Sequence, residues 1–188
     1  MLCELLPSLT TPYWISFQVS GQFNFLQRLF PGNILITIIA DKDKLADGNS
    51  FTEAVQYVLD RCPLVSPSQL EAPWGSGLVA IGVNCCRPSL VSPSLRAIRR
   101  ISESVGLICY PNSGEVWVQT PDLPEGIWTG SEEAPYLSLV EEWLEIMTES
   151  SSHSPPAIIG GCCRIGSAQI RELAKIVKTK KDAQEMKK

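Results

Sequence analysis

Short apolar runs of strand length alternate with amphipathic helical segments along the chain, and this alternation restricts the fold more than any other feature. The runs that predict buried strands lie at 14–17, 78–83, 107–110 and 157–161. The segments with helical spacing lie at 51–62, 92–105, 136–147 and 167–177. Strand–helix units in series predict an α/β fold with parallel strands, whose carboxyl ends share one edge of the sheet.

The helix boundaries rest on specific start signals. Ser50 and Glu53 form a capping box. Ser92 is predicted to be an N-cap with Pro93 in the first turn behind it. Ser167 is predicted to cap the last helix, whose inward face would comprise Ile170, Leu173, Ala174 and Val177. The stretch from 115 to 135 is expected to be a long loop.

Three of the seven cysteines come directly after predicted strands, where a parallel sheet would bring them together: Cys85, Cys162 and Cys163. Three thiolates suit zinc, which prefers four ligands and would keep one position open for catalysis. Gly160 and Gly161 would let the backbone turn tightly enough for two neighbouring cysteines to face one ion. The spacing alone is equally consistent with small cysteines that end buried strands. Cys62 and Cys109 are expected to pack in the core, and Cys86 is expected to point away from Cys85 and so to be a poor ligand.

Composition excludes several classes of function. The 188 residues carry a formal net charge of -4 and no large basic patch, so nucleic-acid binding has no electrostatic support. A zinc finger with two histidines is excluded because the only histidine is His153, which lies in a Ser/Pro linker. The apolar run at 34–40 is about a third of the roughly 20 residues that cross a membrane. Residues 1–12 lack the basic region of a secretory signal, and clustered cysteines in a reducing cytoplasm indicate metal binding rather than disulfides.

Three sequence blocks together are typical of one family. The blocks are Gly82-Val83-Asn84-Cys85, Tyr110-Pro111-Asn112-Ser113-Gly114-Glu115 and Gly160-Gly161-Cys162-Cys163-Arg164. In order and spacing they resemble the zinc-dependent homocysteine S-methyltransferase family. The resemblance implies a (β/α)8 barrel whose C-terminal rim holds Zn2+ through Cys85, Cys162 and Cys163. It also implies methyl transfer from a sulfonium donor, S-methylmethionine or S-adenosylmethionine, to homocysteine, forming methionine. Asn112 and Glu115 are candidates for substrate contacts, with a structural role in the loop as the equal alternative.

The chain departs from the family pattern in two ways. A whole barrel needs about 250 residues, so the strand–helix units are expected to form the C-terminal half, an incomplete barrel with open edges that favour self-association. Residues 18–40 have no counterpart in the family. They are interpreted as an insertion within a partial homocysteine-binding domain at 1–178, which a charged tail at 179–188 follows.

The sequence is also consistent with two other functions. A non-catalytic zinc–thiolate module would bind the metal without transferring a methyl group. A flavodoxin-like binding domain would bind no zinc. Methionine formation from homocysteine and S-methylmethionine separates the enzyme from the first alternative, and a metal assay separates it from the second.

Overall fold

A parallel sheet forms the centre of the computed structural model, which describes residues 34–38, 40–41, 44–45, 50–64, 77–130, 136–149 and 157–186. The sheet has the strand order β1–β4–β5–β8, and every neighbouring pair is parallel. Its strands are β1 (Ile34–Ile38), β4 (Leu78–Asn84), β5 (Gly106–Tyr110) and β8 (Ala157–Ile159). A helix follows each strand, so the predicted α/β fold with parallel strand–helix units is confirmed.

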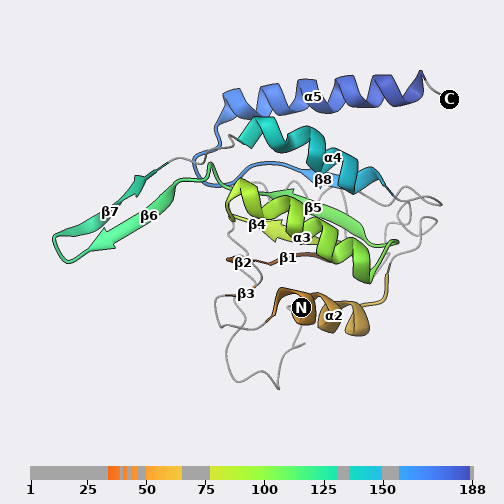
Figure 1. The fold of residues 1–188 in the computed structure, drawn as a ribbon, viewed down its shortest axis with the longest axis horizontal. Helices are drawn as coiled ribbons and strands as arrows, with labels where there is room; N and C mark the ends of the chain where they lie inside the picture. Colours follow the sequence, from red (N-terminus) through yellow and green to blue (C-terminus); the bar gives the residue numbers. More distant parts are fainter. Residues whose placement is uncertain are drawn as a thin grey trace.

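The helices cover the sheet in the described part of the chain (Figure 1). They are α2 (Phe51–Arg61), α3 (Pro88–Ile101), α4 (Val140–Thr148), which the 3₁₀ turn η2 (Tyr136–Leu139) precedes, and α5 (Ser167–Glu185). Helices α3 and α4 lie against the sheet, whereas α2 packs beside α3 and α5 beside α4. The main core contains Ile81, Val83 and Leu107 from the strands together with Leu95, Ile98 and Trp143 from the helices. Every residue of β4 is buried, and the strand lies between β1 and β5 inside the sheet.

Helix α3 begins at Pro88, so the prediction that it starts after Ser92 was wrong. Arg87 is the N-cap residue, and Pro88 occupies the first turn, where a missing N–H costs least. Pro93 lies inside the helix, where its side chain is exposed and does not disturb the core. The apolar stripe extends back to the buried Val91, which was the signal for the earlier start.

Helix α5 differs slightly from its prediction. Its first residue is Ser167, and the Gly166 N–H is capped by the Gln169 side-chain oxygen at 3.1 Å. Leu173 is buried as expected and Ile170 and Val177 pack partly against the core. Ala174, predicted to face inward, is exposed. The helix continues to Glu185 through most of the predicted charged tail. No helix within the described ranges is both long enough and apolar enough to cross a membrane.

The first strand of the described sheet is β1, which pairs in parallel with β4 along Ile36–Ile81 and neighbouring positions. This strand lies within the segment interpreted as an insertion. The strand predicted at 14–17 lies outside the described residues, as does most of that segment. The insertion therefore stays a prediction. A short antiparallel ribbon follows β1 and consists of β2 (Ala40–Asp41) and β3 (Lys44–Leu45).

A second antiparallel ribbon replaces most of the loop expected between 115 and 135. Strands β6 (Val116–Thr120) and β7 (Leu123–Thr129) form a hairpin that projects away from the sheet (Figure 1). Trp117 lies opposite Trp128, and their rings meet edge to face with centroids 5.4 Å apart. The loop prediction was wrong here because two β-branched and aromatic runs around a Pro-Asp turn are themselves a hairpin signal.

Candidate metal centre

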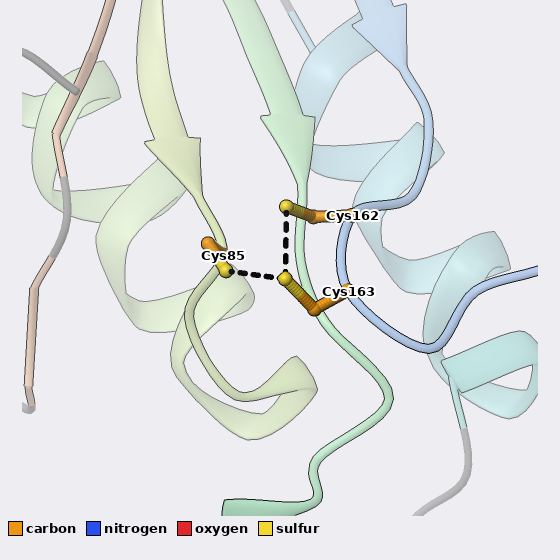
Figure 2. A group of neighbouring side chains, drawn as sticks. All are labelled: Cys85, Cys162 and Cys163. Carbon is orange, nitrogen blue, oxygen red and sulfur yellow. Dashed lines mark hydrogen bonds between the residues drawn. The ribbon is translucent and has the colours of Figure 1, made fainter. Parts of the chain in front are cut away.

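Three cysteine sulfurs converge at the carboxyl edge of the sheet. Cys85 directly follows β4, and Cys162 and Cys163 lie in the loop after β8. Figure 2 shows the three side chains pointing toward one another from these two segments. The Sγ atom of Cys163 lies 3.5 Å from that of Cys85 and 3.8 Å from that of Cys162. All three sulfurs lie within 4.8 Å of one another.

This spacing fits a tetrahedral zinc ion. Sulfur ligands at about 2.3 Å from zinc in tetrahedral geometry lie about 3.8 Å from one another. The observed sulfur separations of 3.5 and 3.8 Å approach that value. Thiolates also favour zinc over magnesium or calcium, which prefer oxygen ligands. The donor set therefore suits zinc and would leave its fourth position to another ligand.

Cys85 reaches the cluster because its backbone turns out of line with β4. Its φ of 49° lies in the left-handed region, which residues other than glycine rarely adopt. Its N–H donates to the Tyr110 carbonyl at 3.1 Å, and its carbonyl accepts from Asn112 Nδ2 at 3.0 Å. The Asn112 N–H donates to the Cys86 carbonyl at 2.9 Å. These bonds hold an unfavourable conformation that turns the Cys85 sulfur toward the β8 loop.

Asn112 uses both ends of its side-chain amide for backbone groups. Besides the bond to Cys85, its Oδ1 accepts from the Gly114 N–H at 2.8 Å. The residue is only 8% exposed. These contacts give Asn112 the structural role that the sequence left open. A contact between Asn112 and substrate stays a prediction.

The loop that carries Cys162 and Cys163 is bonded to the loop after β5. The Cys162 N–H donates to the Pro111 carbonyl at 2.8 Å, and the Ser113 N–H donates to the Cys163 carbonyl at 3.1 Å. These bonds continue the β5–β8 pairing beyond the ends of both strands. The Ile165 N–H donates to the Cys162 carbonyl at 3.1 Å and closes a turn around the second cysteine.

The two glycines before the cysteines have different roles. A Cβ on Gly161 would lie 2.2 Å from Ile165 Cγ2, so no side chain fits there. A Cβ on Gly160 would meet its nearest neighbour, Tyr110 Cβ, at an ordinary 3.6 Å. The Gly160 carbonyl instead anchors the loop, because it accepts from the buried Tyr136 hydroxyl at 2.6 Å.

The three thiols ionise unequally. The hydrogen bond with Cys162, followed by burial, raises the pKa of Cys85 far above its usual range. Burial, followed by the hydrogen bond with Cys85, also raises the pKa of Cys163. The hydrogen bond between Cys85 and Cys162 has the opposite effect on Cys162 and lowers its pKa. Ionisation of all three thiols needs a compensating cation, which a metal site provides.

An ion pair links the two loops beside the sulfurs. Arg164 Nε lies 2.9 Å from Glu115 Oε2, and Arg164 Nη2 lies 3.4 Å from Glu115 Oε1. The Ser113 hydroxyl donates to Glu115 Oε2 at 2.8 Å. Arg164, followed by Ser113, lowers the pKa of Glu115 below its usual value. The carboxylate predicted as a substrate contact is thus bound by two side chains of the protein.

Sequence comparison identifies the family of this chain. A family model described as homocysteine S-methyltransferase matches residues 1–177. The chain belongs to the homocysteine S-methyltransferase family. Within this family it is 30% identical over 139 residues to betaine-homocysteine S-methyltransferase of Drosophila melanogaster, covering 73% of this chain and 36% of the relative. It is 28% identical over 134 residues to homocysteine S-methyltransferase 2 of Saccharomyces cerevisiae, covering 71% of this chain and 35% of the relative.

This homocysteine S-methyltransferase family member spans about a third of the length of the curated relatives it matches, with 36% and 35% for the two above. Among solved structures it matches the oxidized form of the homocysteine methyltransferase MmuM from Escherichia coli. That match has a TM-score of 0.47 at 21% identity and covers 81% of this chain and 39% of the other.

The predicted core positions of Cys62 and Cys109 are confirmed in this family member. The buried cysteines that pack in the core are Cys62, Cys86 and Cys109. Sequence reasoning assigned no role to Ser113, Arg164 or Tyr136, although the first two belong to the blocks that carry the resemblance. It also passed over Asn84, whose Oδ1 is buried one residue before Cys85 and has no hydrogen-bond partner among the described residues.

Proposed function

We propose that this chain holds zinc through Cys85, Cys162 and Cys163, and that the site transfers a methyl group from a sulfonium donor to homocysteine. The convergence of the three sulfurs within 4.8 Å of one another carries the proposal. Three thiolate ligands support zinc as the bound metal. Membership of the family supports homocysteine as the methyl acceptor. S-Methylmethionine and S-adenosylmethionine are the proposed donors.

The reaction makes specific demands on the protein. A bond forms between the homocysteine sulfur and the methyl carbon, while the bond from that carbon to the sulfonium sulfur breaks. The donor leaves as a neutral thioether, so no proton has to be supplied to it. The acceptor, however, must first lose its thiol proton, and a thiol of pKa ~8.5 is only a few per cent ionised at pH 7. Bound zinc would supply a Lewis acid that favours the ionised thiol.

The protein's own residues would fix the positions of the three sulfurs and of the methyl acceptor. The backbone bonds around Cys85 and Cys162 hold the sulfurs together across two loops. An acceptor bound beside them would therefore have a fixed location relative to the donor. In-line placement of the two reacting sulfurs about the methyl carbon would then supply much of the rate acceleration.

The position of the sulfurs in the fold supports a barrel. They lie at the carboxyl ends of parallel strands, which is where the catalytic groups of (β/α)8 barrels lie. We infer that the four described strand–helix units are consecutive units of such a barrel. Further strands from the same chain or from a second copy would pair with β1 and β8 to close it.

Metal content tests the first half of the proposal, with neighbouring cysteines as matched variants. The purified chain should contain about one zinc ion per molecule after dialysis against limiting zinc. Cys85→Ala should abolish that zinc, because two thiolates hold the ion far less tightly than three. Cys86→Ala removes a sulfur that packs in the core and should leave the zinc content unchanged. Equal zinc in the wild type and in Cys85→Ala would contradict the assignment.

Methyl transfer tests the second half. Zinc-loaded protein should form methionine from homocysteine with S-methylmethionine or S-adenosylmethionine, and Cys85→Ala should not. Betaine serves as a donor of a different class, with a quaternary ammonium in place of the sulfonium. Methionine from betaine alone would contradict the sulfonium assignment. Stoichiometric zinc without methionine from any donor would leave a binding module instead of an enzyme.

A further inference from the structure

The Glu115–Arg164 ion pair closes a ring of contacts around Cys163. Arg164 follows Cys163 in the chain, and its guanidinium contacts the Glu115 carboxylate at 2.9 and 3.4 Å. That carboxylate accepts from the Ser113 hydroxyl at 2.8 Å. The Ser113 N–H in turn donates to the Cys163 carbonyl at 3.1 Å. The Cys163 carbonyl and the Arg164 side chain are thus both bound to the loop after β5.

The backbone at Arg164 makes this ring unusual. The bond from the Ile165 N–H to the Cys162 carbonyl makes Cys163 and Arg164 the central residues of a four-residue turn. Arg164 has a φ of 67°, and the third position of a turn with this backbone usually carries glycine. Within the described ranges, Cys85 and Arg164 are the only residues other than glycine with positive φ. Because glycine would adopt this conformation more easily, we infer that the contacts of the arginine side chain compensate for the unfavourable backbone.

The pair contributes little to global stability, since Arg164 is 54% exposed and exposed ion pairs are weak. Its place in the ring indicates a local effect instead. We propose that the Glu115–Arg164 pair is a positioning device that holds the Cys163 sulfur within metal-binding distance of Cys85. Glu115 then acts on the site through Arg164 and does not itself contact the metal. This inference rests on the proposed zinc site.

A double-mutant cycle separates positioning from simple charge. Glu115→Gln, Arg164→Gln and the double variant are compared with the wild type by competition with a chelator for Co2+ and Zn2+. If only charge mattered, loss of Glu115 would weaken cation binding and loss of Arg164 would tighten it. If the pair positions Cys163, each single change should weaken binding roughly 10-fold, as changes around metal ligands do. The double variant should then be no weaker than either single variant.

Spectroscopy and matched variants complete the test. The sulfur-to-cobalt charge-transfer band should lose intensity in both single variants as Cys163 leaves the metal. Glu145→Gln breaks a comparable ion pair, with Lys180 at 2.8 Å between α4 and α5, and should match the wild type. Arg164→Gly suits the turn better than glutamine does, so weaker binding in this variant would show that the side chain is required. Unchanged or tighter binding in Arg164→Gln and Arg164→Gly overturns the proposal.

A measurement on the metal-free protein keeps this inference distinct from the proposed function. In a glutathione redox buffer, the fraction of chains with a disulfide from Cys85 to Cys162 or Cys163 depends on how closely the loops hold these sulfurs. Peptide mapping should show that fraction reduced several-fold in Glu115→Gln and Arg164→Gln but not in Glu145→Gln. If the wild type binds no metal, the proposed function fails while this result still supports the positioning role. Equal disulfide fractions in all variants would contradict that role.

Discussion

The segment after β5 contains two adjoining stretches with opposite properties. Residues 111–115 are mostly polar, yet Asn112 is only 8% exposed and the stretch bonds to both cysteine loops. The β6–β7 hairpin begins at the next residue and carries two tryptophans, yet Trp117 is 47% exposed. From apolar character alone, the polar stretch would be expected at the surface and the tryptophan hairpin in the core.

Backbone bonding explains the difference. In the first stretch the Asn112 and Ser113 N–H groups bond to the cysteine segments, and these bonds offset the cost of burying the polar backbone. The hairpin satisfies its backbone within itself, through the β6–β7 pairing. Its backbone therefore needs no hydrogen-bond partners from the sheet. We conclude that the stretch able to position the sulfurs is the one that depends on its neighbours for hydrogen bonds.

The largest expected effect comes from filling the space beside the cysteine loop. Gly161→Ala puts a Cβ 2.2 Å from the Ile165 side chain, and overpacking of this kind costs about 3 kcal/mol. Urea unfolding should show that loss, together with weaker zinc binding. Gly160→Ala is the matched control, because its Cβ has room, and it should change the free energy of unfolding by less than about 0.5 kcal/mol. Equal effects from the two variants would mean that the loop is not held as described.

An intermediate effect is expected from Asn112→Ala. The change leaves the Cys85 carbonyl and the Gly114 N–H without their partners, at a cost of about 2 kcal/mol. Cys85 should then relax from its positive φ, so zinc affinity should fall in the absence of any substrate. Chelator competition and urea unfolding measure the two quantities. A variant with normal stability and metal affinity but a raised KM for homocysteine would instead favour a direct substrate contact.

The smallest effect is expected from the hairpin. Trp117→Ala removes the edge-to-face contact with Trp128, which contributes about 1 kcal/mol to the hairpin itself. The hairpin projects from the sheet (Figure 1), so zinc affinity should match that of the wild type. Near-ultraviolet circular dichroism should report the lost tryptophan pair. A marked loss of zinc binding would mean that the hairpin, like residues 111–115, helps to position the sulfurs.

Much of the fold could be predicted because its signals are local. The strands at β4, β5 and β8 are continuous apolar runs, and α2 begins after Ser50, whose hydroxyl accepts from the Glu53 N–H. The errors arose where two local signals competed. Pro88 and Pro93 both suit the first turn of a helix, and only the burial of Val91 against the core favours the earlier start. The hairpin was missed because its pattern covers only a few residues on each side of the turn.

The residues at the candidate site could also be predicted, but not the way they are held. Cys85, Cys162 and Cys163 follow strand signals, and parallel strands bring their carboxyl ends together. The bonds from Asn112 to Cys85, and from Glu115 to Arg164, join residues 27 and 49 positions apart. No periodicity or spacing in the sequence encodes such pairs.

The sequence by itself determined the alternating strand–helix units, the carboxyl edge of the sheet as the place of the candidate site, and cysteine thiols as its ligands. These follow from hydrophobic period and residue type, which act over a few neighbouring positions. Only the tertiary structure decided that Cys85 and Arg164 adopt positive φ, and that a polar loop is buried while a tryptophan hairpin is exposed. Those outcomes depend on hydrogen bonds between backbone groups of segments that are far apart in the sequence. Such bonds form only when the tertiary fold brings those segments together.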